Sequence, residues 1–279
     1  MSQLPLGALE RLGRSSLFVT LALALASQFA SPARAQIAVA GDLIYIQEDA
    51  RPGDSYRGTL TLRNQSTAAA TATIYINDVV FEGDVQAFLE PGSHPRSNAD
   101  WIELELGSVQ IEAGESATVG YTVSVPDDPG LHDSYWSMVM VENAPVGEAA
   151  AAQGVRIRSV TRYGIYLVTN ARARTPVQLA FTNPSLKVHE QDGWAFSVSL
   201  VNSGQRLVWP DSYLDLYDGG GEHVRRFEGE PPLVFPEERV GQTFRLANLA
   251  PGEYTGIVVV DAGGEDVFGA RYTLRVGTP

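Results

Sequence analysis

The sequence predicts an all-β fold made of two β-sandwiches. From Ile37 onward apolar residues alternate with a period of two, and short β-branched and aromatic runs are separated by Gly, Pro, Asn and Asp. No amphipathic helical pattern follows Gln36. The 279 residues are enough for two ordinary domains, each with a core of its own.

The first 35 residues have the three parts of a secretory signal peptide. Arg11 and Arg14 precede an apolar run from Leu17 to Ala26, and the small residues of Ala33–Ala35 follow. The run is shorter than the roughly 20 residues that span a bilayer. We therefore expect residues 1–35 to be a signal peptide cleaved after Ala35, and the protein to be a bacterial periplasmic or secreted one without a membrane span after cleavage. An uncleaved anchor is the alternative.

Residues 36–172 are predicted to form the first domain. Turn-forming sequences such as Arg51–Asp54 and Pro126–Gly130 separate its candidate strands. These strands are Ile37–Ile46, Tyr56–Arg63, Thr71–Phe81, Trp101–Leu106, Ala117–Val125, Ser134–Glu142 and Val155–Val168. Seven short strands in about 135 residues are typical of an immunoglobulin-like sandwich.

Residues 173–279 repeat this pattern after a polar break at Asn170–Pro176, and predict a second immunoglobulin-like sandwich. Its candidate strands are Val177–Thr182, Trp194–Asn202, Ser212–Tyr217, His223–Glu228, Val240–Leu246, Tyr254–Asp261 and Val267–Val276. Leu214–Glu222 and Val258–Asp266 each run apolar residues into a Gly-rich turn, where a positive φ costs little. Each of these two segments predicts a tight hairpin.

Charge and cysteine content exclude several kinds of partner and site. The chain has 20 basic and 33 acidic residues, a net charge of −13, and it would repel a nucleic-acid duplex or an anionic membrane surface. With no cysteine it has no disulfide scaffold, no catalytic thiol and no cysteine-ligated metal. We expect no nucleic-acid partner and no cofactor.

Motifs of the local enzymatic kind are absent from the sequence. No Gly-x-Ser-x-Gly elbow, phosphate-binding loop or dinucleotide fingerprint occurs. The four histidines lie far apart, with no close metal-binding spacing: His94, His132, His189 and His223. We therefore predict a protein that is not an enzyme. Histidines or carboxylates gathered in one deep pocket would favour the opposite interpretation.

Calcium is the one ion whose binding the sequence suggests. Asp215, Asp218 and Glu222 surround Gly219–Gly221, and hard oxygen ligands on a flexible loop suit Ca²⁺. The segment lacks the alternating Asp-x-Asp-x-Asp spacing of a dedicated loop, and Asp-Gly is a strong hairpin signal. A hairpin turn is the favoured interpretation, and these three residues are only weak calcium candidates.

The candidate strand Val155–Val168 is longer than the usual three to ten residues. One face carries Val155, Ile157, Tyr163 and Ile165, and the other carries Arg156, Arg158 and Arg162. An overlong strand next to the Ala-rich loop Ala144–Gly154 can accept another chain edge to edge. Two interpretations stay open, namely a stiff connector to the second domain and a connector that is also a binding edge.

Four segments, in this order, resemble the periplasmic pilus chaperones of the PapD type: Leu60–Asn64, Ile111–Glu115, Ser134–Asn143 and Thr161–Tyr166. The resemblance implies two immunoglobulin-like domains, and a long last strand of the first domain that donates alternating apolar residues to an incomplete exported subunit. It further implies that Val155 and Ile157 are the donated side chains. Arg162 would bind the terminal carboxylate of the subunit, a task that suits the forked guanidinium.

A second set of segments resembles tandem immunoglobulin-like domains of bacterial surface proteins, including WxL-type pairs: Arg51–Gly53, Trp101–Ile102, Val123–Pro126 and Asn248–Tyr254. This resemblance implies a structural or adhesive envelope module that binds peptidoglycan or a matrix. The sequence thus predicts an exported protein-binding protein. Its partner is expected to be another exported subunit in the first interpretation and a cell-wall component in the alternative.

Overall fold

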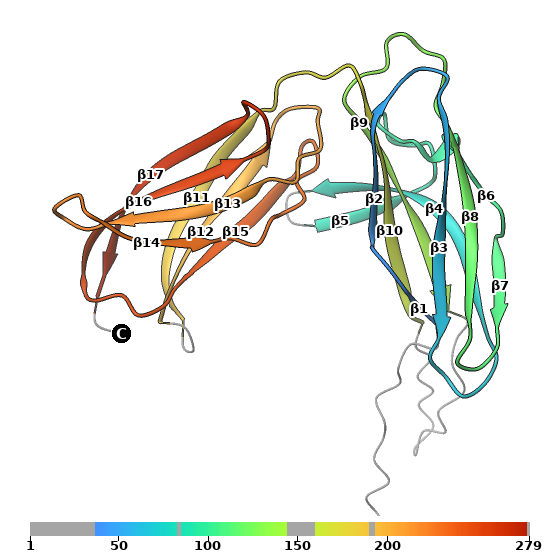
Figure 1. Cartoon of the computed structure of the whole chain (residues 1–279), viewed down its shortest axis with the longest axis horizontal. Helices are drawn as coiled ribbons and strands as arrows, with labels where there is room; N and C mark the ends of the chain where they lie inside the picture. Colours follow the sequence, from blue (N-terminus) through green and yellow to red (C-terminus); the bar gives the residue numbers. More distant parts are fainter. Residues whose placement is uncertain (1–36, 83–84, 144–159, 190–192, 278–279) are drawn as a thin grey trace, which may run out of the picture. The chain divides into compact units, whose positions relative to one another are not determined.

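The chain forms two β-sandwiches, each of two sheets (Figure 1). The computed structural model describes residues 37–82, 85–143, 160–189 and 193–277. Those described residues contain no α-helix, only the 3₁₀ turn η1 (Ala99–Trp101). The predicted all-β class and tandem sandwiches are confirmed, whereas the predicted signal peptide lies outside the described residues.

The first sandwich contains strands β1 to β10. One sheet has the order β1 (Ile37–Val39), β3 (Ser55–Asn64), β8 (Ser116–Ser124) and β6 (Ile102–Leu104). The other has the order β2 (Ile44–Ala50), β10 (Arg162–Ala171), β9 (Ser134–Asn143), β4 (Ala70–Glu82) and β5 (Val85–Leu89), and β7 (Ser108–Ile111) also pairs with β4. Alternate side chains of both sheets meet in a core that includes Leu60, Leu62, Val119, Val139 and Ile165.

The second sandwich is built from the later strands. Its three-stranded sheet has the order β11 (Leu179–His189), β12 (Gly193–Asn202) and β15 (Arg239–Leu246). Its four-stranded sheet has the order β14 (His223–Glu228), β13 (Asp211–Tyr217), β16 (Gly252–Asp261) and β17 (Val267–Val276). The two predicted hairpins are confirmed as the antiparallel pairs β13–β14 and β16–β17. The predicted domain boundary between residues 172 and 173 stays a prediction; it falls between the end of β10 and the start of β11.

The prediction of one strand over Ile37–Ile46 is wrong. The segment forms β1, which pairs with β3, and β2, which pairs with β10 in the other sheet. Gly41 lies between them with a φ of +137°, a conformation that side chains disfavour and that lets the chain leave one sheet for the other. The N-terminal segment therefore belongs to both layers of the first sandwich.

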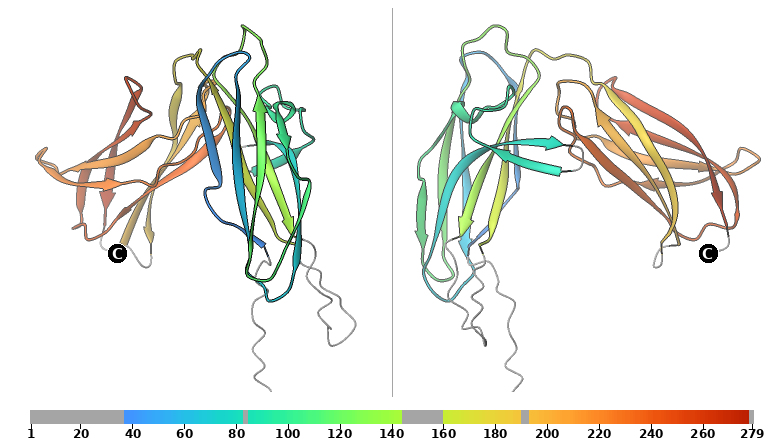
Figure 2. Two further views of the ribbon diagram at one scale, coloured as in Figure 1. Left: turned by 45° about the vertical axis from the view of Figure 1, so that its right-hand side comes forward. Right: turned by 180° about the vertical axis from the view of Figure 1, so that it is seen from behind.

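The long predicted strand also ends elsewhere. Its described part begins at Arg162 and runs to Ala171, three residues beyond the predicted end, because β10 pairs in parallel with β2 as far as Ala171↔Ala50. Val160 and Thr161 are not in a strand, and Val155–Ser159 lie outside the described residues. Two strands were not predicted at all, the short β5 and β7, and Figure 2 shows β4 and β5 as a hairpin.

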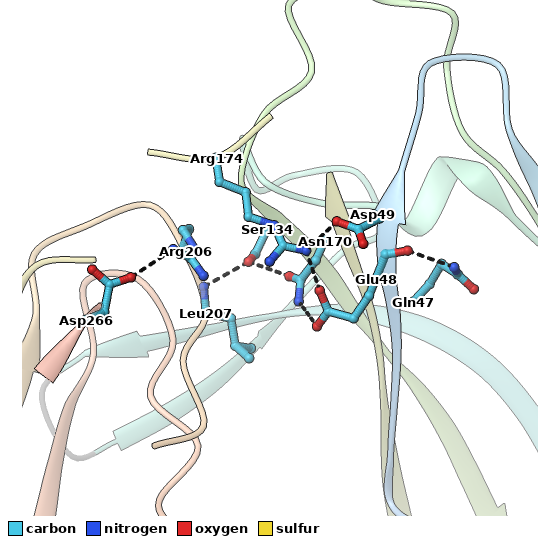
Figure 3. A network of polar contacts seen from close by, with 9 residues as sticks. All are labelled: Gln47, Glu48, Asp49, Ser134, Asn170, Arg174, Arg206, Leu207 and Asp266. Carbon is cyan, nitrogen blue, oxygen red and sulfur yellow. Dashed lines mark hydrogen bonds and ion pairs between the residues drawn. The ribbon is translucent and has the colours of Figure 1, made fainter. Parts of the chain in front are cut away.

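Polar side chains join the two sandwiches near the start of β9 (Figure 3). The Ser134 hydroxyl donates to Asn170 Oδ1 at 2.6 Å and accepts from the backbone N–H of Leu207 at 2.8 Å. Asn170 Nδ2 donates to Glu48 Oε1 at 2.8 Å, and Arg174 donates to the other oxygen of Glu48 at 2.7 Å. Ser134 is 1% exposed, so its two hydrogen bonds satisfy a polar group that is costly to bury unpaired.

An apolar cluster accompanies this network. Phe235, 1% exposed, lies against three aromatic rings of the first sandwich, with ring centroids 5.1 Å from Phe81, 5.2 Å from Trp136 and 5.0 Å from Tyr166. These side chains project from β4, β9 and β10 on the sheet face opposite the sandwich core. One phenylalanine therefore contacts three neighbouring strands of one sheet.

Gly164 in β10 gives room to a neighbouring methionine. A Cβ added to Gly164 would overlap Sδ of Met138 and lie 3.1 Å from its Cγ. Met138 is 4% exposed and belongs to the apolar cluster around Phe235. The absence of a side chain at position 164 thus allows the thioether to lie against the backbone of β10.

We expect Gly164→Ala to lower the free energy of unfolding by about 1–3 kcal/mol, because Met138 must move within a packed cluster. The matched control is Gly241→Ala in β15, where an added Cβ meets nothing within 4 Å. The control should change stability by less than about 1 kcal/mol. Urea denaturation of both variants measures the difference, and equal stabilities would contradict this account of Gly164.

Candidate functional site

The candidate functional site is the edge at the start of β10. β10 pairs with β9 from Arg162↔Glu142 to Asn170↔Ser134, but it pairs with β2 only from Tyr166↔Ile44 onward. The first contact on that side is the hydrogen bond from the Tyr166 N–H to the Leu43 carbonyl, 2.9 Å long. Among the described residues no strand pairs with this side of Arg162–Ile165.

The direction of the backbone groups follows from the same pairing. Successive residues of a strand turn their N–H and C=O groups to opposite sides. Since the Tyr166 N–H points toward β2, the N–H and C=O groups of Arg162 and Gly164 point to the same, unpaired side. The 3.0 Å bond from the Asn143 N–H to the Thr161 carbonyl agrees, because it places the alternate residues on the β9 side. The start of β10 therefore presents backbone donors and acceptors that no described strand pairs with.

Side chains along β10 alternate as the sequence predicts. Tyr163, Ile165 and Leu167 pack into the core of the first sandwich, whereas Tyr166 and Val168 lie in the cluster around Phe235. Arg162 is on the outer face with Tyr166. The other four predicted partner-binding residues, Val155, Arg156, Ile157 and Arg158, lie outside the described residues, so their place relative to Arg162 stays a prediction.

Arg162 is held by a carboxylate on the neighbouring strand. Its Nε donates to Glu142 Oε2 at 2.6 Å, and the Tyr75 hydroxyl donates to the same oxygen at 3.1 Å. The hydrogen bond from Arg162 is the main cause that lowers the pKa of Glu142, and the bond to Glu142 raises the pKa of Arg162. The Arg162 side chain remains 57% exposed, so it is positioned and still accessible to a ligand.

Two exposed apolar side chains lie at the two chain segments that border this edge. Leu43, 50% exposed, accepts the backbone bond at which pairing with β2 begins. Val160, 40% exposed, comes just before β10. Leu43, Glu142 and Tyr75 were not predicted as site residues, because nothing in the sequence shows which residues face one another across neighbouring strands.

A buried carboxylate lies close to Tyr166 on the outer face. Glu238 is 8% exposed, and its Oε2 accepts a hydrogen bond from the Phe235 N–H at 2.8 Å. Burial raises the pKa of Glu238 to about 7, against the opposing effect of that hydrogen bond. Burial and then the nearby Glu238 charge raise the pKa of Tyr166 to about 12, although its hydrogen bond from Gln86 acts in the other direction.

The weak calcium candidates have other partners. Both oxygens of Asp215 are bound by Arg226, at 2.9 and 2.7 Å, and His223 lies 3.1 Å from one of them. Asp218 Oδ1 accepts from the N–H groups of Gly220 and Glu222 in the hairpin turn. The part of the chain that the structure describes holds no group of three or more His, Asp or Glu side chains arranged for a metal ion. The geometry favours the hairpin interpretation of this segment.

Comparison with known proteins gives structural similarity without sequence similarity. No family model matches the sequence, and no curated protein matches it. A chain from a structure titled as a chaperone–tip adhesin complex for CFA/I fimbriae biogenesis has a TM-score of 0.42 and 12% identity, over 88% of this chain and 100% of that one. Two further similar structures are named as bacterial chaperones or chaperone complexes.

One comes from the CsuC–CsuE chaperone–tip subunit pre-assembly complex of Acinetobacter baumannii, with a TM-score of 0.41 and 14% identity over 85% of this chain and 98% of that one. The other is the CupB2 chaperone of Pseudomonas aeruginosa, with a TM-score of 0.39 and 13% identity over 86% of this chain and 100% of that one. In the described part of this chain no helix is long and apolar enough to cross a membrane.

Glu238 gives a testable pH dependence. The unfolded chain loses the proton of this carboxyl near its ordinary pKa of 4.5, whereas the folded protein keeps it until about pH 7. The folded state binds more protons over this range, so the contribution of Glu238 to stability falls as the pH rises from 4.5 to 7.

A glutamine at position 238 cannot ionise. We expect Glu238→Gln to gain stability relative to the parent across this range and to hold that gain above pH 7, as measured by urea denaturation at several pH values. Parallel curves for the two proteins would contradict the assignment.

Proposed function

We propose that this protein is a non-enzymatic assembly chaperone or accessory factor that binds another exported protein subunit by β-strand addition to β10. The single observation that carries the proposal is that one side of Arg162–Ile165 has no strand partner in the part of the chain that the structure describes. An exposed strand edge binds an extended chain through its backbone groups, and pockets for alternate side chains add specificity.

The apolar residues before β10 extend the same contact. Val155 and Ile157 lie an even number of positions before Tyr163 and Ile165, whose side chains face the core of the first sandwich. If the strand continues toward them when a subunit is bound, their side chains point to the interior side, where the subunit lacks a strand of its own. Such an insertion adds apolar burial to the backbone hydrogen bonds.

Arg162 is the proposed anchor for a carboxylate of the subunit. Its bond to Glu142 through Nε holds the guanidinium at the start of the free edge. A guanidinium offers five donors in a planar fork and binds a second carboxylate oxygen pair without losing its first partner. Arg156 and Arg158 lie an even number of positions before Arg162, so a continued strand would place them on the same outer face. They would add positive charge there, on a chain whose net charge is −13.

Export is part of the proposal, since the partner is an exported subunit and the first 35 residues have signal-peptide character. We expect the mature protein to begin at Gln36 in the soluble fraction of the periplasm or medium. Mass spectrometry of the intact protein and of its N-terminal peptide checks this, and a soluble exported protein that still carries Met1 or Ser2 would contradict it.

The binding mode is tested by two substitutions at one position. Arg162→Ala removes the guanidinium and keeps the backbone N–H on the free side, whereas Arg162→Pro removes both. Proline is tolerated at an edge whose N–H is not used in the sheet, so the pairing with β9 should survive. The assay is pull-down and titration with the exported subunits encoded beside this gene, after co-expression.

We expect Arg162→Ala to weaken binding about 10- to 100-fold, the value of one charge-assisted hydrogen bond. Arg162→Pro should weaken binding a further 2- to 10-fold, because one more backbone hydrogen bond is lost. Thermal unfolding of both variants controls for folding. If both variants hold the subunit as tightly as the parent, strand addition at β10 is refuted. Sedimentation of the parent with purified cell wall would instead favour the envelope-module interpretation.

A further inference from the structure

We propose that the edge of β15 is a binding site for an extended peptide segment of another protein, one that carries Asn, Gln, Ser or Thr at the position facing Gln242. The site lies in the second sandwich and uses none of the residues of the candidate site at β10, so it is independent of the proposed function. A cavity of about 590 Å³ opens beside this strand, lined by Phe227, Pro231 and Pro232 as well as by Gly241–Thr243. Ligand sites usually have volumes of about 300–1,000 Å³.

The first support is that β15 is the last strand of its sheet, where β12 is its only strand partner among the described residues. Two backbone hydrogen bonds fix the direction of the groups on β12. The Asn202 N–H donates to the Glu238 carbonyl at 3.1 Å, just before β15, and the Ser203 N–H donates to the Gln178 carbonyl at 3.0 Å, just before β11. Even-numbered residues of β12 therefore bond to β15, and odd-numbered ones bond to β11.

The backbone groups of Gly241 and Thr243 point away from the sheet. These two residues stand opposite Ser199 and Ser197, which are odd-numbered and bond to β11. The N–H and C=O groups of Gly241 and Thr243 therefore lie on the side of β15 that no described strand pairs with, and both residues line the cavity. Such groups bind an extended chain as an added strand.

The second support is a pair of polar side chains in the apolar interior of the sandwich. Gln242 points inward from β15, between Val240 and Phe244, and is 2% exposed. Ser212 points inward from β13 and is 3% exposed. Neither side chain has a hydrogen-bond partner within the described part of the chain. Burying a polar group without a partner costs free energy, so this pair favours a ligand that supplies one.

The two polar groups meet at the cavity from opposite sheets. A Cβ added to Gly229, just after β14, would overlap both Gln242 Nε2 and Ser212 Oγ, and Gln242 itself lines the cavity. A strand that pairs with β15 places one side chain directly opposite Gln242 on the same inward face, with Cβ atoms about 4.5–5.5 Å apart. An amide or hydroxyl at that position can bond to the unpaired groups, whereas an aliphatic side chain cannot.

The other positions of β15 specify the rest of the segment. Val240 and Phe244 flank Gln242 on the inward face, so apolar side chains two positions from the polar residue would be buried beside them. Arg239 and Arg245 lie on the outer face, three residues to either side of Gln242, and β15 contains no acidic residue. Carboxylates three positions from the polar residue complement these charges.

A second copy of this chain is a less suitable occupant. If β15 paired with itself so that the two Gln242 side chains faced each other, Arg239 of each copy would stand opposite Arg245 of the other. Like charges directly opposite each other destabilise a sheet. Each copy also has a net charge of −13.

The test uses a fluorophore-labelled synthetic heptapeptide, Asp-Val-Thr-Asn-Thr-Val-Asp, whose Asn is the residue expected to face Gln242. A matched peptide has Leu in place of Asn. Both peptides are titrated by fluorescence anisotropy with the purified parent protein and with Gln242→Leu. This variant replaces an unpaired buried amide by an apolar side chain of similar size, so its stability should not fall.

We expect the parent to bind the Asn peptide about 10-fold more tightly than the Leu peptide, the effect of one hydrogen bond. Gln242→Leu should lose or reverse this preference. The inference is overturned if the parent binds the two peptides equally, if Gln242→Leu keeps the preference, or if neither peptide saturates the parent below about 1 mM.

The backbone contact is tested separately by Thr243→Pro, which removes one N–H from the edge of β15 and should weaken both peptides about 2- to 10-fold. Its control is Thr243→Val, which keeps the N–H but loses the same hydroxyl contact with Ser197 and should bind like the parent. Circular dichroism and thermal unfolding show that each variant folds.

Two further measurements separate this site from the alternatives. If Arg162→Pro loses the peptides while Thr243→Pro retains them, the peptides add to β10, and the inference fails while the proposed function stands. Sedimentation equilibrium of the parent is the second measurement. A dimer that Thr243→Pro dissociates would assign the edge of β15 to a second copy and would also overturn the inference.

Discussion

The hydrogen bond from the Tyr166 N–H to the Leu43 carbonyl marks the constraint on which the candidate site depends. Beyond it, β10 is an interior strand with β9 on one side and β2 on the other; before it, β9 is the only strand of the described residues that pairs with β10. The change arises because the N-terminal segment leaves this sheet at Gly41 and joins the opposite sheet as β1. One glycine-centred crossover thus decides where β10 has a second strand partner among the described residues and where it has none.

Contacts of the second sandwich stabilise the outer face of the same sheet. Phe235 packs on aromatic rings from β4, β9 and β10, and Ser134 and Asn170 add hydrogen bonds at the other end of β9 and β10. The strands that carry the candidate site are therefore packed on their outer face as well as in the core. In the proposed strand addition, such packing would reduce the conformational entropy that is lost when a partner strand is added.

Residue patterns predicted most of this fold, and their failures have physical causes. The β13–β14 and β16–β17 hairpins were predictable because alternating apolar residues run into Gly-rich turns. β5 was not, because Val85–Leu89 has apolar residues on both faces and no clean alternation. The position of Arg162 on the outer face followed from a period of two, but its bond to Glu142 depends on the register of two strands joined by a long connection. The other predicted partner-binding residues precede Val160 and lie outside the described residues, so their role stays a prediction from the sequence.

The parallel pairing of β2 with β10 has a kinetic consequence. Ile44–Ala50 must find Tyr166–Ala171, more than a hundred residues later in the chain, and the Tyr56 hydroxyl lies 2.7 Å from Thr169 Oγ1 across the same distance in sequence. Closing such a loop costs conformational entropy before the contacts that compensate for this cost can form. Folds dominated by non-local pairing therefore form slowly. The first sandwich cannot complete its second sheet until the whole segment through Ala171 is available. Its N-terminal strands therefore spend the early part of folding with exposed edges of their own.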